Sequence, residues 1–144
     1  MANANVNPNL RYLEASVMSA SPEELIIKVY DALLLFARQA IEVMESHPGD
    51  IQGRHNILRR AQKACAVLMG SLRLDIESEI PGNLLRIYEF WHHELVGANM
   101  HGDPERVRAI LPMISAMRDT WVEAIKRLRV ERAGAARQLG ALVG

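Results

Sequence analysis

Ser21-Pro22-Glu23-Glu24-Leu25 is the segment that decides the fold, because it marks where a helical protein begins. The Ser21 hydroxyl can cap the free amide groups of a helix. Pro22 suits the first helical position, since a proline lacks the N–H that would stay unpaired there. Glu24, three residues after the cap, completes the pattern of a capping box. Beyond this point apolar residues recur every three or four positions, and no segment shows the alternation of a strand, so the sequence predicts helices throughout.

Three breaks, each built around proline or glycine, divide the chain after Ser21 into four helical segments. The breaks are His47-Pro48-Gly49-Asp50, Ile80-Pro81-Gly82-Asn83 and His101-Gly102-Asp103-Pro104. We expect helices over residues 22–47, 51–79, 83–101 and 104–130. Loops this short join antiparallel neighbours, which predicts an all-α fold, an antiparallel up-down-up-down four-helix bundle.

The organisation expected around this bundle has three parts. Residues 1–20 form an N-terminal arm packed on the bundle, and residues 21–130 form the bundle itself. Residues 131–144 form a C-terminal tail that is either disordered or docked back. Pro112 falls inside the last helix, where a proline removes a backbone hydrogen bond, so we expect a kink or a bulge near residues 107–112.

Each expected helix carries an apolar stripe at the spacing of a bundle core. The four stripes are Ile26, Val29 or Tyr30, Leu33, Ala37, Ile41 and Met44; Leu58, Ala61, Cys65, Leu68 and Leu72; Leu84, Tyr88, Trp91, Leu95 and Ala98; and Val107, Leu111, Ile114, Met117, Trp121, Ile125 and Leu128.

Further apolar residues lie outside these core stripes. They are Ile57, Ala64, Val67 and Leu74 on the second helix, Ile87 and Phe90 on the third, and the run Leu33–Ala37 on the first. Scattered surface apolar residues are ordinary, but two adjacent stripes also suit a groove that takes a partner helix. A third interpretation is a homodimer, or a homo-oligomeric structural protein, that packs through Leu33–Ala37.

The N-terminal arm has its own apolar pattern. Leu10, Leu13 and Val17 stand at helical spacing, with Tyr12 beside them. A segment this short does not fold alone, so it needs a surface to lie on, and we expect it to cover the groove as a weakly held latch. The residues expected to bind a partner are therefore Leu10, Tyr12, Leu13, Val17, Ile57, Val67, Leu74, Ile87 and Phe90.

Composition narrows the class of protein. The 144 residues hold 17 Lys+Arg and 17 Asp+Glu, and Cys65 is the single cysteine, which fits a reducing cytoplasm. No apolar run suits a membrane span, and the N-terminus lacks the pattern of a signal peptide, so we expect a cytoplasmic protein without membrane insertion. The second helix carries basic residues and no acidic one up to Leu74. The neutral total argues against nucleic acid, and the basic stripe could instead attract an acidic region of a client.

Chemistry-bearing motifs are sparse. Glu89-x-x-His92 has the spacing of a di-iron ligand pair, but it occurs once, and such sites need a second copy plus carboxylates from the other helices. No glycine-rich phosphate loop or nucleophilic triad is recognisable. We therefore expect no metal, no cofactor and no enzymatic activity.

The chain resembles the flagellar export chaperone FliS family over about residues 10–128. The matching segments are Ala20–Leu25, Val29–Asp31, Ser71–Glu77, Asn83–Leu84, Ile87–Phe90, Leu95–Asn99 and Met117–Ile125. The resemblance implies a helical bundle that binds the disordered C-terminal segment of flagellin, prevents its premature polymerisation and presents it to the membrane protein of the export gate. It also implies that an arm with a tyrosine at Tyr12 covers part of the client surface.

Overall fold

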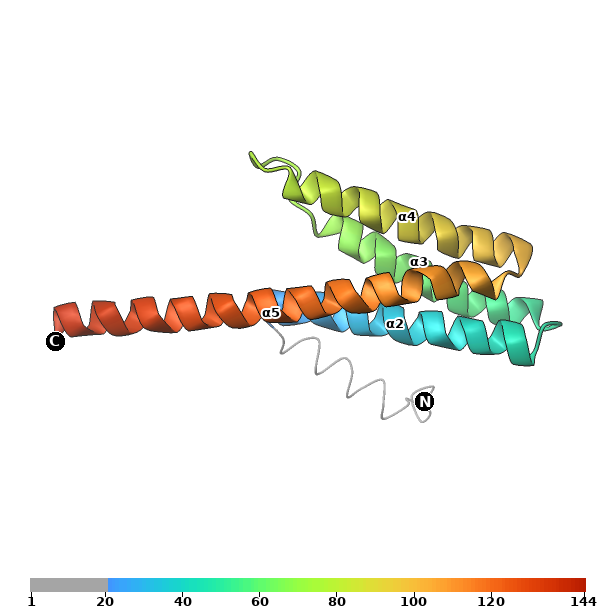
Figure 1. The fold of residues 1–144 in the computed structure, drawn as a ribbon, viewed down its shortest axis with the longest axis horizontal. Coiled ribbons are helices and arrows are strands. Elements are labelled where there is room, and N and C mark those ends of the chain that lie inside the picture. The colour runs from blue at the N-terminus through green and yellow to red at the C-terminus, as the bar shows by residue number, and fades with distance from the viewer. Residues whose placement is uncertain (1–20) are drawn as a thin grey trace, which may run out of the picture.

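The computed structural model describes residues 21–144, and this part of the chain forms four α-helices (Figure 1). They are α2 (Pro22–Ser46), α3 (Ile51–Gly70), α4 (Ile80–His101) and α5 (Pro104–Val143). Helix α2 packs against α3 and α5, and α4 packs against the same two helices. The helices therefore close a four-membered ring, and the predicted antiparallel bundle is confirmed. The arm, residues 1–20, lies outside the described residues.

The helix ends follow from side-chain caps. The Ser21 hydroxyl accepts a hydrogen bond from the Glu24 amide at 3.2 Å, which confirms the predicted cap. Asp103 caps α5 in the same way by accepting from the Glu105 amide at 3.0 Å. Between α4 and α5, Gly102 has a φ of 62°, the left-handed conformation that a residue without a side chain adopts most easily.

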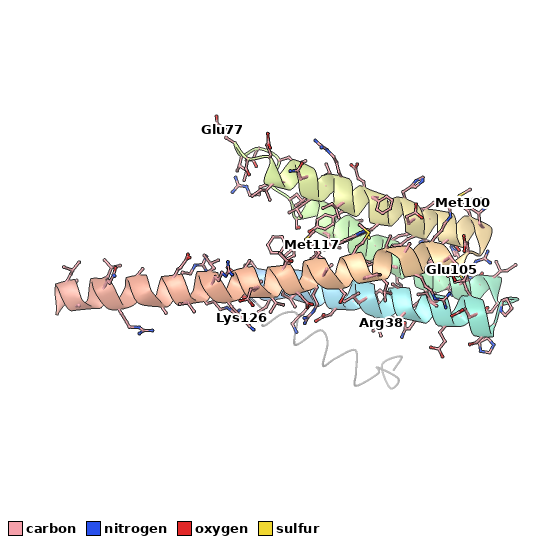
Figure 2. The ribbon with its side chains drawn as sticks, viewed as in Figure 1. Arg38, Glu77, Met100, Glu105, Met117 and Lys126 are labelled. Carbon is pink, nitrogen blue, oxygen red and sulfur yellow. The ribbon has the colours of Figure 1, made fainter. Side chains whose placement is uncertain are left out.

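The second helix is shorter than the sequence predicts. Expected to run to residue 79, α3 ends at Gly70, where the Ser71 hydroxyl donates to the Leu68 carbonyl at 2.7 Å. The following residues form an exposed loop with Glu77 at its tip (Figure 2), and α4 begins three residues earlier than expected. Leu74 therefore lies in a loop and not on a helical stripe. Within residues 21–144, Leu74 and Ile76 of this segment stay exposed, so a longer helix here would not be stabilised by burial of these side chains.

The last helix is longer than predicted. Helix α5 continues past residue 130 to Val143, so residues 131–143 are helical and not a disordered or docked tail. Figure 1 shows this C-terminal part projecting beyond the other three helices. The helix passes through Pro112 as a continuous α-helix, so the bulge expected there is absent, whereas a kink stays a prediction.

The core is built around aromatic side chains from α2 and α4. The rings of Tyr30, Tyr88 and Trp91 are all buried, and their centroids lie 5.5 to 6.3 Å apart. Tyr30, and not Val29, takes the inward position on α2. Trp121 on α5 donates from its indole nitrogen to the Tyr30 hydroxyl at 3.1 Å, and the two tyrosine hydroxyls lie 2.7 Å apart. Three helices thus share one small hydrogen-bond network.

Most of the predicted core residues are buried, with differences at the ends of the stripes. On α5, Ile110 is fully buried and the predicted Leu111 only partly, while Leu128 is exposed. The Leu33–Ala37 run is part of the same core, since Leu33, Leu34 and Ala37 are buried. That run is therefore not an open face for a homodimer, and only Leu35 within it is half exposed.

Candidate functional site: an apolar groove between α2 and α3

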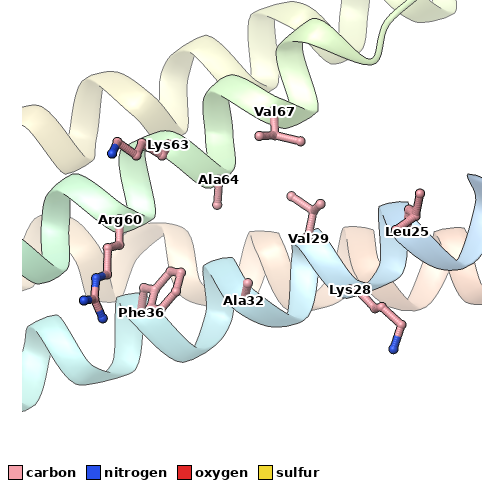
Figure 3. Close-up of a pocket in the computed structure, with 9 residues that line it drawn as sticks. All are labelled: Leu25, Lys28, Val29, Ala32, Phe36, Arg60, Lys63, Ala64 and Val67. Atoms are coloured by element: carbon pink, nitrogen blue, oxygen red, sulfur yellow. The ribbon is translucent and has the colours of Figure 1, made fainter. Parts of the chain in front are cut away.

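A groove of about 360 Å³ lies between α2 and α3 (Figure 3). From α2 it is lined by Leu25, Lys28, Val29, Ala32 and Phe36, and from α3 by Arg60, Lys63, Ala64 and Val67. Val29 and Val67 face each other across the gap, and Phe36 closes the end near Arg60. Its floor and walls are hydrocarbon, so water inside it has few hydrogen-bond partners and is readily displaced by an apolar side chain.

The groove follows from the spacing of small and large residues. On α2, the lining positions recur at intervals of three and four residues, from Leu25 to Phe36, beside the core stripe that carries Tyr30 and Leu33. Ala32 and Ala64 sit near the middle of the two walls. Because an alanine ends at its Cβ, no side chain at these two positions is long enough to fill the gap between the helices.

The charges along the groove have one sign. Its charged lining residues are Lys28, Arg60 and Lys63, and no acidic residue lines it. Arg60 and Lys63 also border a neighbouring polar hollow of about 440 Å³ with Asn56 and Arg59. Within residues 21–144, Arg59, Arg60 and Lys63 make no ion pair. The α3 edge of the groove is therefore an uncompensated positive strip.

A second hollow, on the other side of α2, differs in charge. It lies between α2 and α5, has a volume of about 350 Å³, and is lined by Glu24, Ile27, Lys28, Asp31, Val122, Ile125, Lys126 and Arg129. Here acidic and basic residues alternate, and Arg129 pairs with Glu24 at 2.9 Å. Charged side chains of both signs line this hollow, which makes it a weaker candidate for an apolar ligand.

The predicted partner-binding residues do not all meet in one place. Val67 lines the groove. Ile57 on α3 and Ile87 on α4 are partly buried and pack against the core, whereas Phe90 is exposed on α4, away from the groove. Leu74 is exposed in the loop after α3. The arm residues Leu10, Tyr12, Leu13 and Val17 lie outside the described residues.

The sequence prediction of partner-binding residues does not include the residues of α2 that line the groove. Leu25, Val29 and Phe36 all line the groove, although none is among the predicted partner-binding residues. A usable signal was present, because their spacing of four and seven residues gives a stripe next to the core stripe. The sequence leaves open whether Val29 or Tyr30 faces the core, and this ambiguity makes the second stripe hard to recognise.

The buried polar groups do not suggest catalysis. Burial raises the pKa of the Cys65 thiol to about 12, so the sulfur is not a ready nucleophile. Burial also raises the pKa of Tyr30 and of Tyr88. Among residues 21–144, no three His, Cys, Asp or Glu side chains gather in a way that could hold a metal ion. Within the same range no helix is long and apolar enough to cross a membrane.

The fold and the groove define an all-helical bundle with an apolar groove on its surface. The chain belongs to the family described as flagellar protein FliS, whose model matches residues 4–128, and this family is non-enzymatic. A flagellar secretion chaperone FliS from Bacillus subtilis (strain 168) is 29% identical over 128 residues, which cover 89% of this chain and 93% of the relative. One from Escherichia coli (strain K12) is 26% identical over 117 residues, covering 78% and 82%.

A solved structure supports the fold independently. The crystal structure of a flagellar chaperone from bacteria aligns with a TM-score of 0.68, covering 83% of this chain and 99% of the other, at 15% sequence identity. At that identity the match shows a shared fold. Residues 129–144, the outer end of α5, lie beyond the range that the family model matches.

Proposed function

We propose that this protein is a cytoplasmic flagellar secretion chaperone that binds the disordered C-terminal segment of flagellin. In this role it prevents premature polymerisation of flagellin and presents the subunit to the membrane protein of the export gate. The observation that carries the proposal is the open apolar groove between α2 and α3, in a chain that belongs to the FliS family.

The groove suits a segment that folds as it binds. An amphipathic client helix would place an apolar side chain every three or four residues along Val29, Val67 and Phe36. Each buried anchor contributes about 1.5–3 kcal/mol, and ordering the client costs about 1–2 kcal/mol per residue. With one anchor every three or four residues, ordering costs about 3–8 kcal/mol per anchor, more than the anchor contributes. The backbone hydrogen bonds that form as the client becomes helical, about 0.5–1.5 kcal/mol each, offset the remainder, so the net affinity stays low enough for binding to be reversible. A chaperone that must release its client for export needs this reversibility.

The N-terminal arm belongs to the same proposal. Leu10, Tyr12, Leu13 and Val17 cover the groove when no client is bound, and the client displaces them. Deleting residues 1–18 then raises the affinity for the client, or lowers solubility because apolar surface is left uncovered. Unchanged affinity and unchanged solubility would show that the arm is not a latch.

The test is a calorimetric titration with a peptide of roughly forty C-terminal residues of the cognate flagellin. Saturable one-to-one binding with a large negative heat-capacity change is expected, because apolar surface is buried while the peptide folds. Val67→Asp places a charge in the groove and is expected to weaken binding about tenfold or more.

The matched control is Leu35→Asp. Leu35 is as exposed as Val67, at 50% against 54%, and is also helical, but it does not line the groove. It is therefore expected to leave the affinity unchanged. Ile57→Asp is a poor substitute, because Ile57 packs against the core. Equal losses in the two Asp variants, or no binding by the unaltered protein, would overturn the proposal.

A further inference from the structure

We propose that the groove selects a client helix that carries acidic residues along one edge, placed against Arg60 and Lys63. The inference rests on the proposed function and names the chemistry of the partner segment. Arg60 and Lys63 are called the basic edge below.

The basic edge borders the apolar lining directly. Figure 3 shows Arg60 reaching from α3 toward α2 beside Phe36, with Lys63 one turn further along the same helix. A ligand helix lying in the groove would therefore bring its flank within reach of both cations. Since the lining holds no carboxylate, the groove itself offers these cations no counter-charge.

The lack of counter-charge is local and not a consequence of composition. The whole chain has as many acidic as basic residues. On α5, Arg108, Arg118, Arg129 and Arg132 each pair with a carboxylate of α2. Helix α3, by contrast, has no acidic residue from Ile51 to Gly70. Like charges one turn apart repel each other by a few tenths of a kcal/mol, and an incoming carboxylate would relieve that repulsion.

The spacing predicts the form of the partner. Arg60 and Lys63 are three residues apart, so a client helix meets them best with two acidic residues one turn apart, at i and i+3 or i+4. The guanidinium of Arg60 can hold a carboxylate through two parallel hydrogen bonds, while Lys63 acts as a point charge. Apolar residues would continue along the adjacent face of the same helix, in the groove.

The experiment compares charge reversal on and off the basic edge. The full chain, the double variant Arg60→Glu/Lys63→Glu and the control Arg59→Glu are titrated with the flagellin C-terminal peptide at about 50 mM and about 500 mM NaCl. Arg59 is the matched control, because it is the exposed neighbour of Arg60 on α3 but does not line the groove. The neutral pair Arg60→Gln/Lys63→Gln serves as a milder second variant, and circular dichroism checks that each variant is folded.

The expected result is a clear difference between the two positions. The double reversal weakens binding about tenfold or more at low salt and removes most of the salt dependence, while Arg59→Glu changes affinity less than about threefold. A peptide whose acidic residues are replaced by lysine regains affinity for the double reversal. That charge-swapped rescue would identify the edge as the contact.

Two failures are distinguishable. Equal binding by the unaltered protein and the double reversal, together with loss of binding in Val67→Asp, would overturn the acidic-edge inference and leave the proposed function standing. Absence of binding by the unaltered protein at concentrations on the order of tens of micromolar would overturn both.

Discussion

The two sides of α2 differ in charge and packing: the side toward α5 carries ion pairs, and the side toward α3 carries an apolar groove. Toward α5, four carboxylates of α2 pair with four arginines: Glu23 with Arg132, Glu24 with Arg129, Asp31 with Arg118 and Glu45 with Arg108. Toward α3, the surface is an apolar groove edged by cations that have no acidic partner in its lining. The α5 seam is thus neutralised by side chains of the chain itself, whereas within residues 21–144 no acidic side chain lines the groove on the α3 side.

Under the proposed function, the α5 side of α2 contributes to stability and the outer stripe on its α3 side contributes to binding. The ion pairs of the α5 side are exposed, and each contributes little, but together they fix which residues of α2 and α5 lie side by side. The α3 side contributes to the core through Tyr30 and Leu33 and leaves its outer stripe free. Changes on the two sides should therefore have different consequences.

The largest effect concerns the wall directly behind the groove. Cys65 is fully buried next to Ala64, a groove-lining residue. Its thiol is expected to react with a thiol reagent at neutral pH at least about 1,000-fold more slowly than in the unfolded chain, because reaction requires the bundle to open. The same single-cysteine protein in denaturant is the control. Similar rates in the two states would mean that α3 separates freely from α2.

The next effect breaks the hydrogen-bond network at the centre of the bundle. Tyr30→Phe leaves the Tyr88 hydroxyl and the Trp121 indole without their shared partner and is expected to lower the free energy of unfolding by about 1–3 kcal/mol. Tyr88→Phe keeps the Trp121 bond to Tyr30, so its cost is expected to be about 0.5–1.5 kcal/mol. Urea denaturation measures both values, and a larger loss in Tyr88→Phe would contradict the network described here.

A smaller effect is expected when one basic residue facing each side of α2 is replaced and the free energies of unfolding are compared. Arg118 bonds Asp31 through its Nε at 2.5 Å, so Arg118→Gln is expected to cost about 0.2–1 kcal/mol of stability. Lys63→Gln removes a groove cation without an ion pair and is expected to leave the free energy of unfolding unchanged. Denaturation midpoints test this, and an equal cost at both positions would remove the distinction between the two seams.

The smallest effect is the response of the α5 seam to acid. A hydrogen bond with the backbone, followed by one with Arg132, lowers the pKa of Glu23, and a hydrogen bond with Arg108 lowers the pKa of Glu45. A lowered pKa in the folded state means that the stabilisation is present above the ordinary value of 4.5 and is lost as the pH falls below it. Thermal unfolding followed from pH 6 downward is expected to show this decline. Glu45→Gln should make the decline shallower, and an identical slope would exclude Glu45 as a contributor.

The sequence predicts the bundle better than it predicts the groove. The starts of α2 and α5 are set by the local caps Ser21 and Asp103, so they can be found without knowing the rest of the fold. Helix α4 has no side-chain cap, and its start is predicted three residues too late. Helix ends depend on tertiary packing. The helical pattern after Gly70 is plausible by itself, yet in the part of the chain that the structure describes Leu74 is exposed and lies in a loop. In the same way, α5 continues through Gly134 to Val143, although a glycine after several basic residues often ends a helix.

Which residues line the groove depends on how each helix is rotated about its own axis, and the periodicity of apolar residues in the sequence does not determine this rotation closely enough. Val29 and Tyr30 are adjacent in the chain, and either could face inward, but only the placement of α4 with Tyr88 shows that the tyrosine does. Once Tyr30 is inward, Val29 must point toward α3 and line the groove. The predicted Val67 lies there for the complementary reason, as the residue just before the buried Leu68.

Helix α5 is long enough to project beyond the other three helices. At 1.5 Å per residue its 40 residues extend about 60 Å, whereas the 25 residues of α2 extend about 38 Å. The ion pairs Glu24–Arg129 and Glu23–Arg132 join the N-terminal end of α2 to α5. The C-terminal part of α5 projects beyond these pairs. Amide hydrogens past residue 132 should therefore exchange quickly while those of the bundle stay protected. A label or surface tether attached at Gly144 would stand clear of the groove.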